Sequence, residues 1–155
     1  MQPVFHPLPA RIAEHYRRGG ADAYGLSPEP RVVTGGGVPC RATLRPLPEG
    51  APYLIVAHRP FEGLNPYTET GPIFLSAEPG AMAEPTEALP PFLTSAAYIL
   101  RGYSADERIL YGTGSVVPTP GIIDAAARLL ERPEVAFLHI RSASNNCFHC
   151  RVERG

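Results

Sequence analysis

The chain has 155 residues and a formal net charge of −1, and 44% of its residues are hydrophobic while 19% are charged. This length suits one domain with a sizeable core, and the balanced charge argues against a nucleic-acid-binding surface and against disorder. All 14 positively charged side chains are arginines, which excludes a Schiff base on a chain lysine and a Walker-type phosphate loop.

Two helices are predicted. The first runs from about Pro9 to Arg18, with proline in its first turn and the pair Gly19-Gly20 after its end. The second and main helix covers about 119–132, with Thr119 as its expected N-cap. Its apolar residues recur at helical spacing and would face a core: Ile122, Ala126, Leu129 and Leu130.

The remaining apolar runs are short, rich in β-formers and bounded by turn residues, which is typical of strands. Because the links between them are short, antiparallel pairing is favoured. The sequence therefore predicts an α+β fold, a single domain over residues 1–155, in which one main helix and a short N-terminal helix pack a mostly antiparallel β-sheet. The predicted strands are Cys40–Leu44, Tyr53–Arg59, Pro72–Ala77, Ala97–Tyr103, Arg108–Tyr111, Val135–Arg141 and Cys147–Glu153.

The last two predicted strands flank five polar residues, 142–146, and we expect them to form a hairpin. If Arg141 pairs with Cys147, His139 lies opposite His149. Side chains alternate along a strand, so the opposite face would pack its apolar residues under the main helix. The simpler interpretation, which stays open, is a solvated face on a half-buried sheet. The residues of the polar face would be His139, Arg141, Cys147, His149, Arg151 and Glu153.

The spacing Cys147-x-x-Cys150 matches half of a zinc site, which His139 or His149 and Cys40 would have to complete. On a strand, however, residues three apart point to opposite faces, and no second Cys-x-x-Cys occurs. We therefore expect no metal, with Cys150 in the core and Cys147 on the polar side as the more reactive thiol. Gly-rich cofactor motifs are incomplete, and no cofactor is expected.

Arginines recur in or beside the predicted strands, and guanidinium groups suit carboxylates and phosphates. We hypothesise that Arg41, Arg141 and Arg151 converge with His149 on one anion site. The alternative is that the arginines pair internally with carboxylates, of which Glu69 and Glu153 are the obvious partners.

Several of these segments resemble a bacterial family of unknown function, DUF1203. The resemblance rests on Pro39-Cys40-Arg41, on YTETGPIF from Tyr67 to Phe74, on LRGY at residues 100–103, and on the ending VAFLHIR…CF…RVER. It extends over nearly the whole chain and implies a single domain. It directs attention to Arg41, His139, Cys147 and Arg151 without assigning them roles, because the family has no activity to carry over.

Two functions are compatible with these residues. In the first, arginines hold a small anionic molecule while His139 or Cys147 performs acid–base or nucleophilic chemistry. In the second, the polar face is a non-catalytic structural or protein-interaction module. A pocket that encloses His139, Cys147 and two or more arginines would favour the first, and a flat face the second.

The expected compartment follows from the ends of the chain and the cysteines. The start MQPVFHPLPAR has no signal-peptide pattern, and no apolar run is long enough to span a bilayer. Three cysteines, an odd number, fit a reducing compartment better than a disulfide framework. We therefore expect a cytoplasmic protein that binds neither membrane nor nucleic acid, and its oligomeric state stays open.

Overall fold

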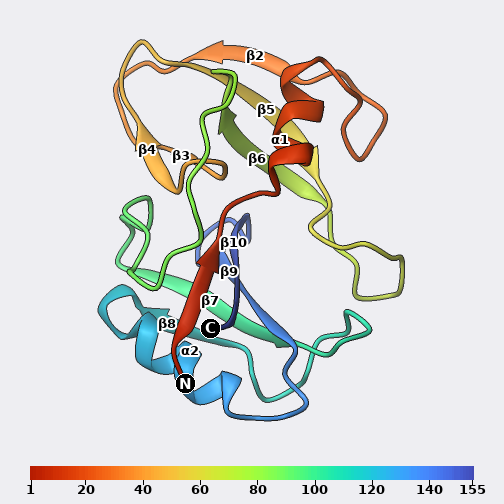
Figure 1. The fold of residues 1–155 in the computed structure, drawn as a ribbon, viewed down its shortest axis with the longest axis vertical. Helices are drawn as coiled ribbons and strands as arrows, with labels where there is room; N and C mark the ends of the chain where they lie inside the picture. The colour runs from red at the N-terminus through yellow and green to blue at the C-terminus, as the bar shows by residue number, and fades with distance from the viewer.

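Two antiparallel sheets, one above the other in Figure 1, hold most of the regular structure of the computed structural model, which describes residues 1–155. The lower sheet has five strands in the order β1-β10-β9-β7-β8, and the upper sheet has three in the order β2-β5-β6. Together with two α-helices, these sheets confirm the predicted α+β class.

The five strands of the lower sheet come from both ends of the chain. A 3-10 turn, η1, leads into the helix α2, which packs on one face of this sheet. The bounds are β1 Pro3–His6, β7 Ala97–Tyr103, β8 Ser115–Pro118, η1 Thr119–Gly121, α2 Ile122–Leu130, β9 Phe137–Ser142 and β10 Phe148–Arg154.

The upper sheet is formed by the first half of the chain, and α1 lies beside it (Figure 1). A separate two-stranded ribbon, β3–β4, lies at its flank. The bounds are α1 Ala10–Arg17, β2 Glu29–Val32, β3 Val38–Cys40, β4 Arg45–Leu47, β5 Pro52–His58 and β6 Gly71–Ser76.

Each sheet has its own apolar core. In the lower core, Ile122, Ala126 and Leu130 of α2 pack on the sheet, as the helical spacing predicts. In the upper core, Ala13 and Tyr16 of α1 pack with residues of β5 and β6. The face of the lower sheet that α2 leaves free is thus turned toward the upper sheet.

An irregularity in β10 decides which side chains reach this free face. The register of the β9–β10 hairpin shifts between Phe148 and Cys150, so one residue more lies on β10 than on β9. Phe148 therefore belongs to the upper core, whereas Cys150 belongs to the lower one. The predicted pairing of Arg141 with Cys147 and of His139 with His149 is wrong: Arg141 lies opposite Phe148 and His139 opposite Arg151.

Arg41 holds this irregular point of the sheet. Its Nε donates a hydrogen bond of 2.8 Å to the carbonyl of Phe148, and its Nη1 donates one of 3.0 Å to the carbonyl of Pro39. The backbone of Arg41 also accepts from Leu8 N and donates to the carbonyl of Phe74. One buried residue thus ties β10 to the upper sheet and to the segment between β1 and α1. Burial lowers the pKa of Arg41 to about 10, which leaves the guanidinium charged at neutral pH.

Several sequence predictions of local structure are wrong. Residues 41–44 form a turn between β3 and β4 instead of a strand, and 108–111 contribute only an isolated bridge. Thr119 does not cap α2, since η1 precedes the helix and no side chain caps it. Four strands were not predicted, β1, β2, β4 and β8, and β3 overlaps a predicted strand only at Cys40. With three or four residues each, these strands are too short for a clear alternating pattern, and only their sheet partners make them strands.

If Arg41 holds the two sheets together, the substitution Arg41→Lys lowers the free energy of unfolding by about 2–3 kcal/mol. An ammonium group keeps the charge but cannot reach both carbonyls as the guanidinium does. Urea unfolding measures the change. The matched control is Arg45→Lys, at an exposed position on β4 whose side chain makes no hydrogen bond or ion pair, which we expect to stay within about 0.5 kcal/mol of the unchanged protein. Equal stabilities for both variants would contradict this role.

Candidate functional site

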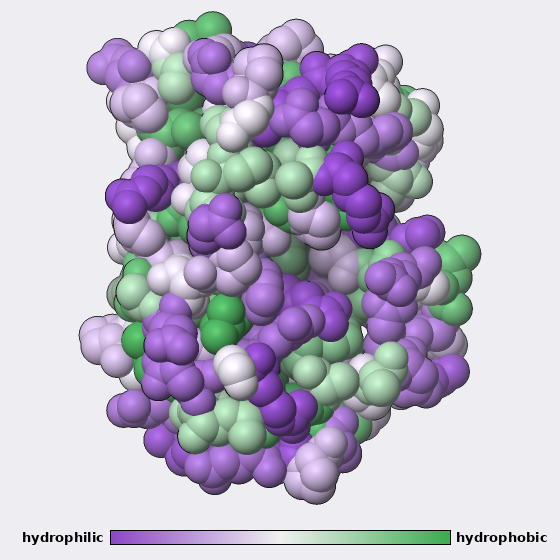
Figure 2. Space-filling model, viewed as in Figure 1, coloured by the Kyte–Doolittle hydropathy of each residue, from purple (hydrophilic) through white to green (hydrophobic).

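A cavity of about 830 Å³ lies between the two sheets. In the space-filling view the surface is hollowed between the upper and lower parts of the molecule (Figure 2). The cavity is walled by the free face of the lower sheet, by the start of α1, and by the segments that follow β5 and precede β7. Its volume falls in the range of small-molecule sites, about 300–1,000 Å³.

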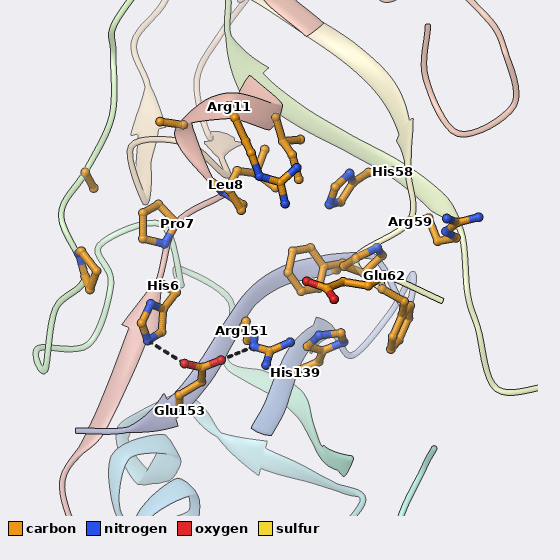
Figure 3. A pocket seen from close by; sticks show the side chains of 18 of the residues that line it. His6, Pro7, Leu8, Arg11, His58, Arg59, Glu62, His139, Arg151 and Glu153 are labelled. Atoms are coloured by element: carbon orange, nitrogen blue, oxygen red, sulfur yellow. Dashed lines mark hydrogen bonds and ion pairs between the residues drawn. The ribbon is translucent and has the colours of Figure 1, made fainter. Parts of the chain in front are cut away.

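A row of basic side chains crosses the floor of the cavity. His6 on β1 lies opposite Arg151 on β10, Arg151 lies opposite His139 on β9, and His139 lies opposite Arg101 on β7. Residues opposite each other on neighbouring strands project from the same face of a sheet. His6, Arg151 and His139 line the cavity (Figure 3), while Arg101 lies beyond its edge.

His139 is fully buried in the floor, and neither of its ring nitrogens has a hydrogen-bond partner. Four aromatic rings surround the imidazole, with centroids 4.8–5.2 Å from its own: Phe61, Tyr103, Phe137 and Phe148. Burial, helped by the nearby charges of Arg141 and Arg151, holds the pKa of His139 well below its usual value. The ring is therefore neutral at physiological pH, with one N–H donor and one acceptor.

Arg151 lies next to His139 and is held from two sides. Its guanidinium carbon is 3.7 Å from the ring centroid of Phe137, a close cation–π contact. Its Nε donates to Glu153, whose other oxygen is 3.6 Å from Nε2 of His6 (Figure 3). The side chain is still 39% exposed, so part of the guanidinium remains accessible from the cavity.

The opposite wall carries Arg11 from α1 and His58 from the end of β5. The side chain of Arg11 makes no hydrogen bond or ion pair and points into the cavity in Figure 3, as the carboxylate of Glu62 does from the side. Nδ1 of His58 is hydrogen-bonded to the Tyr16 hydroxyl at 2.9 Å. Burial and the charge of Arg41 lower the pKa of His58 to about 4.

The residues singled out in the sequence divide between this cavity and other places. His139 and Arg151 lie in it. Arg141 and Cys147 line a smaller neighbouring cavity, and Arg41 lines neither of the two. The structure therefore does not bring Arg41, Arg141 and Arg151 together. The internal ion pairs considered as the alternative are present, Arg141 with Glu69 and Arg151 with Glu153.

His149 does not share the polar face, which corrects the expectation from simple alternation. The register shift turns it toward the lower core, where its ring packs against Phe92 and Tyr98. Its Nδ1 donates a 3.2 Å hydrogen bond to the carbonyl of Cys147, and burial lowers its pKa to about 4.

The cysteines are free thiols. Cys150 is buried, and burial raises the pKa of its thiol to about 12, whereas Cys147 is partly exposed. This placement matches the sides predicted for the two thiols. No group of three or more His, Cys, Asp or Glu side chains is arranged to hold a metal ion.

The sequence reasoning missed the opposite wall. Arg11 lies within the predicted first helix and His58 within a predicted strand, and both were treated as parts of those elements only. No local pattern places either of them against the C-terminal hairpin. The only available sign was that His58 is followed by Arg59 and Pro60 at a strand end, where binding residues are common.

A sequence model of the family described as "Protein of unknown function (DUF1203)" matches residues 37–154. The chain belongs to this family. No curated protein and no solved structure matches the chain. The family match begins after β2, so it includes the floor residues His139 and Arg151 and the wall residue His58, but not His6 or Arg11. No helix of this DUF1203 protein has the length and apolar character needed to cross a membrane.

The buried histidines predict that the protein becomes less stable as the pH falls. The pKa values of His58 and His149 lie near 4, and that of His139 lies well below its usual value, against about 6.5 in an unfolded chain. As the pH falls below about 6.5, the unfolded state binds protons that the folded state does not, and the free energy of unfolding decreases by up to about 1.4 kcal/mol per pH unit for each histidine.

Urea unfolding between pH 5 and 7 measures this slope, in a window where carboxylates with ordinary pKa values stay ionised in both states. His149→Gln removes one titrating histidine. For this variant we expect the free energy of unfolding to change less steeply with pH, by the contribution of one histidine. A stability that does not change over this window would contradict the burial of the three rings.

Proposed function

We propose that the cavity between the sheets binds a small organic anion that has an apolar or aromatic part. The anionic group would lie between Arg151 on the floor of the cavity and Arg11 on the wall opposite it. The apolar part would pack against Phe61 and Phe148, which line the same cavity. Arginine is suited to this role because its guanidinium offers several donors in the geometry of a carboxylate or phosphate.

The observation that carries the proposal is the unpartnered His139 in the cavity floor. A buried polar atom without a hydrogen bond costs about 1–3 kcal/mol, and His139 has two of them. An apolar side chain at the same place would avoid this cost, since all its closest ring neighbours are aromatic. The imidazole beside Arg151 is therefore best explained by a polar group of a ligand that hydrogen-bonds to it.

The charges of the cavity support an anionic ligand that also carries a hydrogen-bond donor. Glu153 is engaged by Arg151 and His6, and both oxygens of Glu107 accept backbone N–H groups, from Glu62 and Gly63. Four charged residues that line the cavity have no side-chain partner, Arg59, Glu84, Arg11 and Glu62, and Figure 3 shows the last two, Arg11 and Glu62, pointing into it. Arg11 suits the anionic group, and Glu62 suits a hydroxyl or amino group on the same molecule.

The histidines favour binding over acid–base catalysis. An efficient general base has a pKa near the working pH, whereas the pKa of His58 is about 4 and that of His139 is also strongly lowered. Cys147 lies outside this cavity, so the thiol is not available to a ligand bound between Arg11 and Arg151. The alternative of an interaction module has less support, because the polar face lies within a cavity and not on a flat surface.

We also propose that the protein works in the cytoplasm. Its cysteines are all free, and Cys40 and Cys150 are buried, which suits a compartment that keeps thiols reduced.

The substitution His139→Leu tests the proposal. We expect it to raise the free energy of unfolding by about 1–2 kcal/mol, because it removes two unpartnered polar atoms at similar volume. The control is His149→Leu, which leaves the carbonyl of Cys147 without its donor and should lower stability by about 1 kcal/mol. If His139→Leu is as destabilising as His149→Leu, His139 is a structural residue.

The same variant is then used in a binding assay. Benzoate, 3-phenylpropionate and phenyl phosphate are titrated in thermal-shift and calorimetric measurements, with benzyl alcohol as the uncharged comparison. We expect at least one anion to raise the melting temperature of the unchanged protein in a saturable manner. His139→Leu and Arg11→Ala should each weaken this binding about tenfold or more, while Arg45→Ala leaves it unchanged. Binding that is equal in all variants would reject the site.

A further inference from the structure

A second, smaller cavity of about 180 Å³ lies at the turn end of the β9–β10 hairpin. Arg141 of β9 and Cys147, just before β10, both line it. His58, Pro60 and Phe148 line both this cavity and the larger one, so the two are neighbours. Its volume is several times the roughly 30 Å³ that one water molecule occupies in the liquid.

Arg141 carries unused hydrogen-bonding capacity at this cavity. Its side chain is only 4% exposed. Nη1 donates to the carbonyl of Asn146 at 3.0 Å and is 3.0 Å from a Glu69 oxygen, whereas Nε and Nη2 are buried without any partner. The N–H groups of Nε and Nη2 lie along one edge of a guanidinium, and this edge binds the two oxygens of a carboxylate side by side.

The surrounding charges favour a single negative charge. Glu69 is shared by two arginines, since one oxygen accepts from Arg101 Nη2 at 2.6 Å and the other pairs with Arg141. Two cations and one carboxylate leave a net charge of +1 in this group. One carboxylate ligand would neutralise it, whereas a phosphate dianion would leave an excess negative charge in a partly buried place.

We propose that this second cavity binds a small monocarboxylate, which lies against the Nε–Nη2 edge of Arg141, and that Cys147 faces the bound molecule. The site is separate from the one proposed between Arg11 and Arg151 and does not depend on it. The proposed site gives Arg141 and Cys147 a common role in binding the carboxylate. Arg151 and His139 line the larger neighbouring cavity instead.

Alkylation of Cys147 by two matched reagents tests the proposal. In both reactions the thiolate sulfur bonds to the CH₂ carbon and iodide leaves, but iodoacetate carries a carboxylate while iodoacetamide is neutral. Rates are measured at neutral pH, and the labelled residue is identified by mass spectrometry. We expect iodoacetate to react with Cys147 about tenfold faster than iodoacetamide, with saturation, and acetate to slow both reagents.

Variants assign the effect to Arg141. Arg141→Lys keeps the charge that Glu69 requires but lacks the two-donor edge, and it should bring the two rates within about twofold of each other. Arg45→Lys, on β4, should behave as the unchanged protein does. If iodoacetate is not faster than iodoacetamide in the unchanged protein and acetate gives no protection, the proposal is wrong. Protection by inorganic phosphate equal to or better than that by acetate would overturn the assignment to a monocarboxylate.

Discussion

The hydrogen bond from Arg41 to the carbonyl of Phe148 is the contact on which the floor of the cavity depends. A register shift in an antiparallel ladder leaves backbone groups without their usual strand partners, and a buried carbonyl requires another donor. Arg41 Nε supplies it at 2.8 Å. With this shift in place, Phe148 turns toward the upper sheet and Arg151 lies opposite His139. With simple alternation, His149 would occupy the face that Arg151 now shares with His139.

Most of the buried side-chain polar atoms without a hydrogen-bond partner belong to strand β9. Of the five buried side-chain polar atoms without a partner, four belong to His139 and Arg141, which are two residues apart on the same face of β9. Each residue lines one of the two neighbouring cavities. Natural sequences depart from complete hydrogen bonding mainly where function requires it, and each departure lowers stability. Each of the two cavities is therefore lined by buried polar atoms that lower the stability of the protein.

The sequence allowed the fold class, both helices and the C-terminal hairpin to be predicted, because these features follow from local periodicity. His139 and Arg151 were also found, since alternation places polar residues on one face of a strand. The placement of His149 could not be predicted, because the extra residue in β10 turns Phe148 and His149 to the faces opposite those expected, restores the expected faces from Cys150 onward, and leaves no mark in the hydrophobic pattern. Arg11 was missed for another reason. Only tertiary packing brings it near the hairpin, because about 130 residues separate Arg11 from His139 along the chain.

A crystal structure of the protein with bound benzoate would test the account most directly, because it locates the anion and the imidazole partners together. We predict that the carboxylate contacts Arg151 or Arg11, that a nitrogen of His139 hydrogen-bonds to the ligand, and that the ring packs on Phe61 or Phe148. Benzoate outside this cavity, or a His139 whose nitrogens are both bonded to groups of the protein itself, would contradict the account.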